Sequence, residues 1–487
     1  MTHRLTPAAL SAVLLLVSPA YAQGVSPAAT PASVLSNPFY QGPTAMAPRL
    51  IGGPLSLKVT GYTRARLMSE WNYDLDASTV QDAFRPYLDL RSTVGLEAVL
   101  NQVRVVTSVD LAGSDFDEGM IWGWDNPSRQ RPSVLNLRHL YLDYVIPETG
   151  FQASIGRQRA HLGLGIVSSV NRDSIKLTQQ LGNLGPSGTH NVTAVWVRGG
   201  DGNTLWPGQM PVPPGTPVAT GSSAPTTVND PNGAAHDLNA LVLAYNLFPA
   251  PGQRVQLFGA QQFDATATGA YPQKRFADVN WEATAGAFRG GAELVYLGGQ
   301  SPAASGQRQT LNSYAAFLTG TYSLGAFDLG LTFGRGGGDD NASDTVNGNF
   351  QSLFIDEGSL SYNHLFGDDL WGFNGTDASI GRGAGLANVT ILQPSLGWRL
   401  SDLTECRLSY TKHWATSPRV AGTGIFGTPD PSGATDIGDE VDLRLGHLFG
   451  SSLLYGATSV FIPGNVFPAP GSANAAYKLE IGTETRF

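Results

Sequence analysis

The chain has 487 residues, with 59 glycines, 31 prolines, one cysteine and a formal net charge of −9. This mildly acidic balance argues against nucleic acid as a partner. The single cysteine excludes an internal disulfide. No apolar run reaches the roughly 18 residues that a membrane-spanning helix needs, so the sequence predicts no transmembrane helix.

The first 22 residues have the three-part pattern of a secretory signal. His3 and Arg4 form a positive end, and residues 8–17 form an apolar centre that is too short to span a bilayer as a helix. Residues 20–22 read Ala-Tyr-Ala, which is a typical small-x-small cleavage site. We therefore predict a signal peptide over residues 1–22 and export from the cytoplasm, in preference to a buried N-terminal helix.

Two further segments follow the predicted signal. Residues 23–54 are rich in proline, alanine, serine and glycine without periodicity, which predicts a flexible periplasmic segment. From residue 55 to residue 487 the strand pattern continues with no linker that divides it. This pattern favours one large closed sheet over residues 55–487 rather than several soluble domains.

The strand pattern is an alternation of apolar and charged side chains, because successive side chains of a strand point to opposite sides. Near the start, Leu57 and Val59 alternate with Lys58 and Thr60. The clearest alternation is at residues 475–487, where an apolar face opposes a charged one and the chain stops on an aromatic residue. Such strands are typical of a wall between lipid and a water-filled lumen. The alternative is an ordinary edge strand of a soluble protein.

The spacing of these patterns predicts about 18 strands, an even number as in bacterial outer-membrane barrels. Short turns alternate with longer loops at 113–133, 199–235, 336–385 and 416–436, as expected for periplasmic turns and outer loops. The predicted fold class is all-β: a single closed antiparallel transmembrane β-barrel of the outer-membrane type. The strands are placed near residues 55–68, 85–99, 102–112, 134–146, 150–159, 171–180, 189–198, 236–247, 252–263, 274–286, 289–299, 309–322, 326–335, 386–400, 403–415, 437–449, 452–463 and 475–487.

Neither a metal site nor a cofactor nor a catalytic centre is predicted. The glycine- and aspartate-rich run at residues 336–344 offers oxygen ligands for calcium but lacks the spacing of a twelve-residue calcium loop, so a solvated acidic loop is favoured. The histidines show no paired metal spacing, and no serine elbow is present. We therefore predict that the protein is not an enzyme. A barrel enzyme with catalytic residues scattered over several strands is the alternative.

Charged residues of both signs fall on the predicted lumen face. Fixed arginines attract an anion and replace part of its hydration, and nearby carboxylates hold the arginines and keep binding weak enough for release. The alternative is that these charges only fill and brace the lumen. The pore-lining candidates from this alternation are Lys58, Arg64, Arg85, Arg91, Asp143, Arg407, Glu440, Asp442, Arg444 and Glu480.

Several short stretches give the chain a likeness to a known family. In their order and spacing they resemble the alginate-export family of outer-membrane β-barrel channels, over most of residues 55–487. The stretches are Leu-Ser-Leu-Lys-Val-Thr-Gly at 55–61, Arg-Pro-Tyr at 85–87, residues 138–144, Gly-Arg-Gln-Arg at 156–159, Gly-Arg-Gly-Gly-Gly-Asp-Asp at 334–340, Arg-Gly at 382–383 ahead of Leu-Ala-Asn at 386–388, Tyr-Thr-Lys-His-Trp at 410–414 and Asp-Ile-Gly-Asp-Glu-Val-Asp-Leu at 436–443.

The resemblance implies a constriction of basic lumen residues that selects an anionic uronate polymer. It adds Arg138, Arg159 and Arg382 to the pore-lining candidates. The alternation puts Arg138 and Arg159 on the lipid face, unless a bulge intervenes or they lie above the membrane. The chain departs from the family at residues 453–457, which lack arginine, and at the short turn 450–451. Both departures predict a weaker constriction and an ungated periplasmic mouth.

The predicted function is a bacterial outer-membrane channel that passes an alginate-like anionic polysaccharide from periplasm to cell surface by passive diffusion. The alternative is a general or substrate-specific uptake porin for small anionic or sugar solutes. The expected partners are outer-membrane lipid, the anionic polysaccharide or solute, and periplasmic secretion proteins. A monomer is expected from the family resemblance.

Overall fold

The computed structural model describes twelve stretches of the chain. The predicted signal peptide, the segment at 23–54 and the loop residue Arg382 lie outside them. Within these stretches, no helix is long and apolar enough to cross a membrane. The described residues are 56–71, 85–112, 120–122, 136–183, 188–200, 238–264, 273–302, 308–341, 345–353, 386–421, 430–467 and 475–486.

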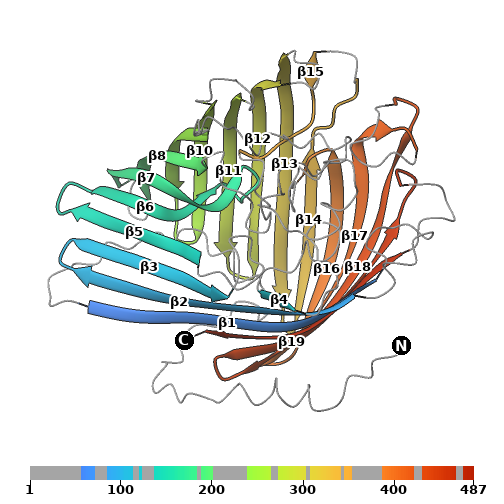
Figure 1. Ribbon diagram of the computed structural model, residues 1–487, viewed down its shortest axis with the longest axis horizontal. Coiled ribbons are helices and arrows are strands. Elements are labelled where there is room, and N and C mark those ends of the chain that lie inside the picture. Colours follow the sequence, from blue (N-terminus) through green and yellow to red (C-terminus); the bar gives the residue numbers. More distant parts are fainter. Residues whose placement is uncertain are drawn as a thin grey trace, which may run out of the picture.

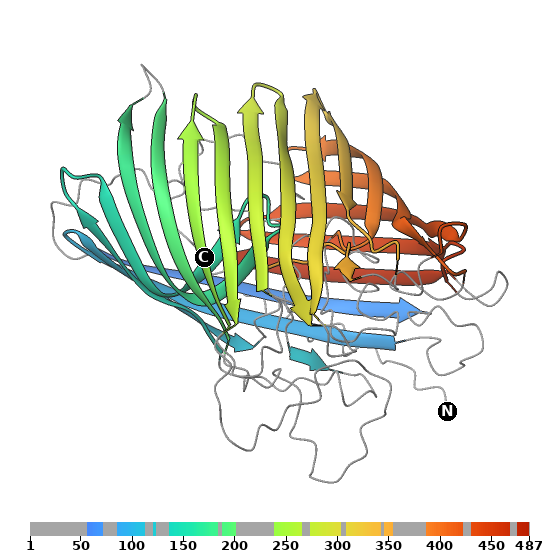
Figure 2. The ribbon, with the colours of Figure 1, turned by 90° about the horizontal axis from the view of Figure 1, so that it is seen from above.

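Eighteen antiparallel strands of the described chain form one closed ring, and this confirms the predicted fold class. Figures 1 and 2 show that they follow one another around the wall in chain order. The ring strands are β1 (Ser56–Trp71), β2 (Arg85–Leu100), β3 (Val103–Ala112), β5 (Asn136–Ile146), β6 (Phe151–Leu162), β7 (Ser168–Asn183), β8 (Thr189–Gly200), β9 (Leu238–Phe248), β10 (Gln253–Asp264), β11 (Gln273–Ala285), β12 (Phe288–Pro302), β13 (Arg308–Leu324), β14 (Phe327–Gly336), β16 (Val389–Ser401), β17 (Thr404–Arg419), β18 (Ala434–Phe449), β19 (Ser452–Pro463) and β20 (Ala476–Arg486).

Two short strands lie beside this ring. β4 (Met120–Trp122) pairs with β2, and β15 (Val346–Asn347) pairs in parallel with β13. The ring itself closes where β1 pairs with β20, from Tyr62 opposite Arg486 to Trp71 opposite Tyr477. In Figure 1 the blue first strand runs beside the red last strands. Closure removes the open sheet edges that hydrocarbon does not tolerate.

The connections at one end of the barrel are tight turns. The β11–β12 and β13–β14 turns have two residues each and begin with Gly286 and Gly325, at φ values of +57° and +59°. Such two-residue hairpin turns require positive φ, which glycine adopts without strain. The opposite end carries the longer connections. We call these the short-turn end and the long-loop end, and the asymmetry is that of outer-membrane barrels.

The two faces of the wall differ as the alternation predicts. In β11, Lys274, Asp278 and Asn280 are buried inside the barrel, whereas Val279 and Trp281 are exposed on its outside. The same holds around the ring, where exposed leucine, isoleucine and valine side chains alternate with buried polar ones. An apolar outer band and a polar interior are what a barrel in lipid requires.

Aromatic pairs mark the short-turn end on the outside. Trp281 stacks on Phe288 with ring centroids 6.5 Å apart, and Phe327 stacks on Trp398 at 6.1 Å. All four residues lie near the short turns that join or flank their strands. Outward aromatic residues at this level form the girdle that sits at a membrane–water interface.

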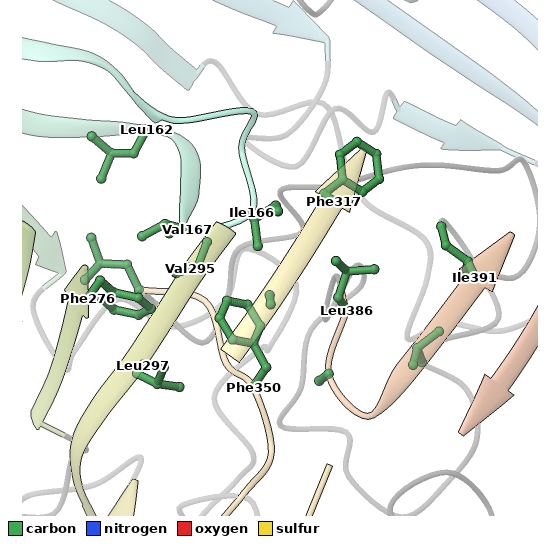
Figure 3. Packing of buried hydrophobic residues seen from close by; sticks show 14 of the residues in the cluster. Leu162, Ile166, Val167, Phe276, Val295, Leu297, Phe317, Phe350, Leu386 and Ile391 are labelled. Carbon is green, nitrogen blue, oxygen red and sulfur yellow. The ribbon is translucent and has the colours of Figure 1, made fainter. Parts of the chain in front are cut away.

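The interior is not polar throughout, because an apolar cluster lies beside the charged lumen side chains. Towards the long-loop end, apolar side chains from β11, β12, β13 and β16 meet apolar side chains of the connections, as Figure 3 shows. The β6–β7 connection brings Ile166 and Val167 inside, and the Leu353 backbone N–H donates to the Val167 carbonyl at 2.9 Å. The connections therefore fold into the barrel and narrow it.

An arginine-lined arc of the lumen wall

Many of the charged lumen residues lie on one arc of the wall, formed by β17–β20, β1–β3, β5 and β6, whereas others, such as Arg254 and Glu282, lie elsewhere on the wall. Arg64, Arg91, Asp143 and Glu480 occupy inward positions of the alternation and are all buried inside the barrel. Most arginines on the arc contact a carboxylate of the same or a neighbouring strand, and Arg444 contacts the ring of Tyr455. The arc contains four such groups, described below from β1 outward.

The first group centres on Asp89 of β2. Arg64 donates to the Asp89 carboxylate at 2.8 Å, and Arg66 also donates to it. Arg66 reaches Glu480 of β20 at 3.4 Å, and Tyr455 donates a hydrogen bond to the same Glu480. Two arginines of β1 are thus fixed by carboxylates of both neighbouring strands, which is the charge-assisted bonding that orients a guanidinium.

The second group centres on Asp110 of β3. Arg91 and Arg138 lie on either side of its carboxylate, at 3.6 Å and 3.9 Å. Arg138 reaches the lumen through a β-bulge. Ser108 pairs with His139 and Val109 pairs with Leu137, so the register skips Arg138 and turns its side chain inward. The structure thereby resolves the conflict between the alternation and the family resemblance at this residue.

The third group joins β2, β3, β5 and β6. Arg104 donates to Glu97 at 3.0 Å and to Asp143 at 3.2 Å. Ser154 donates to the other oxygen of Asp143 and approaches Gln158 at 2.9 Å. Asp143 therefore acts here as a fixed partner for an arginine.

The fourth group lies on β17 and β18. Arg407 contacts Glu405 at 3.4 Å, and Arg444 lies 4.9 Å from the ring centroid of Tyr455, a cation–π contact. Ser409 donates to Asp442 at 3.3 Å, and Glu440 is fully buried beside them on the inward face of β18. In the register of these strands Arg407 stands directly opposite Arg444.

Arg66, Arg104 and Arg407 are more exposed to the lumen than Asp89, Asp143 and Glu405, which they contact, although Glu97 is as exposed as Arg104. The side chains of Arg66, Arg104 and Arg407 are 18%, 21% and 31% exposed, whereas those of Asp89 and Glu405 are each 1% exposed. The formal charges of the arc nearly balance, but the accessible charge is cationic. An anion in the lumen therefore meets guanidinium groups first.

The remaining sequence candidates are placed less centrally. Lys58 is exposed near the short-turn end of β1, opposite Glu97. Arg85 begins β2, where its backbone pairs with Glu70. Arg159 is exposed on the outward face of β6, between the buried inward residues Gln158 and Ala160. The expectation that Arg159 lines the pore is therefore not met, because no bulge shifts the β6–β7 register at this position.

A second polar group lies on the opposite wall, and sequence analysis missed it. Asn246 donates to Asn191 at 2.8 Å, and Gln256 donates to Asn246 at 2.6 Å. Asn280 extends this row by donating to Gln256 at 3.2 Å. The signal was present as uncharged polar residues at alternate positions of β8 to β11, but a search for charge passes over amides.

The inward connection between β6 and β7 is anchored on this amide wall. The Leu164 backbone N–H donates to the Glu293 carboxylate at 2.6 Å, and the Gly163 N–H donates to Gln256 at 3.1 Å. Gly163 has φ +62°, and a Cβ there would lie 2.1 Å from a Glu293 oxygen. Glycine is thus required where the connection meets Glu293.

We expect Glu293→Ala to enlarge the conducting path, because the β6–β7 connection loses the carboxylate that holds the Leu164 N–H. Single-channel conductance in a planar bilayer should rise, with larger open-state noise. Glu293→Gln is the matched control, since its side-chain oxygen still accepts the hydrogen bond, and its conductance should stay near that of the parent. An unchanged conductance in the alanine variant would contradict the anchoring role.

No metal site emerges from the side chains that the structure describes. Among them, no group of three or more histidine, cysteine, aspartate or glutamate residues could hold an ion. In the aspartate-rich run, the Asn341 N–H donates to the Asp339 side chain at 3.3 Å and the Asp339 N–H donates to Asn349 at 2.9 Å. These bonds describe an ordered polar loop, and residues 342–344 lie outside the described chain.

The closed ring, its apolar outer band and its polar interior define the fold of an outer-membrane porin. Solved porins of Pseudomonas aeruginosa share it. OprD matches with a TM-score of 0.52 and 10% identity, over 89% of this chain and 95% of that one. OpdK, solved with vanillate, matches with a TM-score of 0.51 and 12% identity, over 89% and 98%. OccK8 (OprE) matches with a TM-score of 0.51 and 10% identity, over the same shares.

The comparisons of sequence give no family. No family model matches the chain, and no curated protein matches it. The likeness to the solved porins is in fold, at identities far too low to carry an activity. The outer-membrane β-barrel of the sequence prediction is therefore supported, and the alginate-export family in particular is not.

Proposed function

We propose that the protein is an outer-membrane channel for the passive uptake of small anionic solutes. The observation that carries this proposal is the pairing of like charges on the lumen wall. Arg64 stands directly opposite Arg91, and Arg407 directly opposite Arg444. Like charges at directly opposed strand positions are destabilising, so a wall that needed only bracing would avoid them.

The arrangement suits weak binding of an anion that must also leave. Partly exposed guanidinium groups on β1, β3, β5 and β17 offer successive contacts along the wall. The carboxylates beneath them hold each group in place and reduce the net field. Entry is favoured without a deep energy minimum, which is the requirement for conduction.

Small solutes are favoured over a polymer by the inward connections. Ile166, Val167 and Leu353 are fully buried in an apolar cluster towards the long-loop end. A chain of linked sugars would have to displace or thread past this cluster. The neighbour solved with vanillate supports the same direction by analogy, since vanillate is a small carboxylate.

Export of an alginate-like polysaccharide is the second candidate, with periplasmic secretion proteins as partners. The sequence likeness and the lumen arginines favour it, whereas the narrowed long-loop end opposes it. In either case we propose a bacterial outer-membrane location, reached through a signal peptide cleaved after Ala22. We propose a monomer, as the family resemblance implies.

Purified protein in a planar bilayer tests the choice of solute. We expect the reversal potential in a KCl gradient to show a preference for chloride over potassium. Small monocarboxylates such as vanillate should reduce the chloride current, and uronate oligomers should have less effect. A cation preference would overturn the anion channel. Stronger block by uronate oligomers than by monocarboxylates would instead support the polysaccharide channel.

A further inference from the structure

Two carboxyl groups lie close together inside the wall at the point where the β6–β7 connection is anchored. Asp278 of β11 and Glu293 of β12 are 7% and 3% exposed. Glu293 stands opposite Asn280 in the register, so Asp278, two positions along the strand, is its diagonal neighbour on the same face. The two carboxyl groups interact directly with each other. A hydrogen bond between two carboxyl groups requires a proton on one of them, because ionised carboxylates only accept.

One oxygen of each carboxyl group already has a donor. The Leu164 backbone N–H donates to Glu293 Oε2 at 2.6 Å, and the Asn280 side chain donates to Asp278 Oδ1 at 3.1 Å. The second oxygens, Asp278 Oδ2 and Glu293 Oε1, are buried and accept no hydrogen bond from the donors that the structure describes. A proton shared by the two groups supplies the missing donor, and it avoids the cost of two adjacent buried negative charges.

Apolar side chains lie on both sides of this pair. β10 places Phe258 opposite Asp278, and β13 places Phe317 opposite Glu293. Both phenylalanines are buried, and they belong to the same apolar cluster as Val167 of the β6–β7 connection. Two ionised carboxylates in such surroundings repel each other more strongly than they would in water.

The charged neighbours do not offset this repulsion. Arg254 of β10 acts on Asp278, but its guanidinium is shared between the Glu282 carboxylate and, at 3.4 Å, the Gly163 carbonyl. Glu282 itself adds negative charge beside Glu293. A second negative charge on the pair would therefore meet a carboxylate as well as a guanidinium. The titratable side chains that face the pair from the elements packed around it are Arg254, Glu282 and His161, which is close to Arg254 at the end of β6.

We propose that Asp278 and Glu293 share one proton and form a pH-sensitive latch for the β6–β7 connection. With the proton in place, the two carboxyl groups are joined and Glu293 accepts the Leu164 N–H. When the proton passes to water at alkaline pH, the two carboxylates repel each other and the connection is released. The held arrangement binds one proton more than the released one, so a rise in pH favours release. The latch requires that the barrel conducts ions, whichever solute it carries.

Single-channel conductance in a planar bilayer, measured from neutral to alkaline pH, tests the latch. We expect the parent conductance to rise to that of Glu293→Ala. The ratio of released to held channels should increase by up to roughly tenfold per pH unit, the limit for one proton. Asp278→Asn should keep its neutral-pH conductance throughout, because the asparagine N–H takes the place of the shared proton. Glu293→Gln should do the same, since its amide can donate to Asp278 and accept from Leu164.

The matched control is Asp328→Asn on β14. Asp328 is also a buried inward carboxyl group, but it lies at the short-turn end, where it accepts a hydrogen bond from Ser323 at 2.5 Å. This variant should show the same alkaline rise in conductance as the parent. A parent conductance that does not change with pH would overturn the proposal. So would an alkaline rise that persists in either amide variant of the latch, or one that disappears in the control.

Discussion

Asp89→Ala is expected to lower the free energy of unfolding by about 3–5 kcal/mol, the cost of removing one partner from a buried ion pair. Asp89 is 1% exposed and holds Arg64, which is 5% exposed, together with Arg66. Without the carboxylate, Arg64 stays inside the wall facing Arg91. Urea unfolding in detergent micelles, followed by tryptophan fluorescence, measures the change.

Glu97→Ala provides the matched control on the same strand. Glu97 also pairs with an arginine, Arg104 at 3.0 Å, but both side chains are more than a fifth exposed. A pair that water can reach contributes about 1 kcal/mol or less, so this variant should unfold near the parent. Equal losses in the two variants would mean that burial does not set the strength of the Asp89 group.

The double variant Arg407→Gln/Arg444→Gln is expected to lose most of the anion preference of the channel. These side chains face each other on neighbouring strands, and Arg407 is among the more exposed arginines of the arc. Each lost charge should reduce the chloride-to-potassium permeability ratio by roughly fivefold, or about 1 kcal/mol per charge. Reversal potentials in a KCl gradient measure the ratio.

The variant Arg275→Gln tests whether ion selectivity depends on the charges inside the lumen or on the total charge of the protein. Arg275 is exposed on the outward face of β11, next to the buried inward residues Lys274 and Phe276. Its loss should leave the permeability ratio unchanged, because the wall lies between this charge and the lumen. A drop of similar size in both variants would show that selectivity follows net charge rather than the arc.

The strand pattern was predictable because two solvents dictate it. Each strand must show one face to lipid and the other to the lumen, so alternation extends over most of β1, β2 and β20 without help from distant contacts. The tight turns at Gly286 and Gly325 add local signals. The predicted strand positions agree with the described strands to within a few residues.

The site was predictable only as far as strict alternation holds. Arg64, Arg91, Asp143 and Glu480 face the lumen by simple counting. Arg138 also faces the lumen, but counting places it on the outside. A bulge on β5 shifts the alternation by one residue, and the local sequence gives no sign of the bulge. Arg159 is the opposite case, since family resemblance suggested a lumen role and regular pairing keeps it outside.

The narrowed long-loop end could not be read from the sequence. Leu294 to Leu297 of β12 is apolar on both faces, so alternation gives no preference for lipid or lumen. Whether an apolar side chain of β12 belongs to the inner cluster is decided by contact with Val167 and Leu353, which come from connections far away in the chain. Contacts of that kind depend on the finished barrel.

The pairing of β1 with β20 also determines how late in folding the barrel can close. The seam joins residues separated by more than 400 positions, so it carries the largest loop-closure cost in the described barrel and should be among the last pairings to form. Until this pairing forms, the sheet of the folding chain has two open edges with unpaired backbone N–H and C=O groups. Newly made chains should therefore depend on a holding chaperone, and a defect at Tyr62 or Tyr477 should reveal itself as slow insertion rather than as lost conductance.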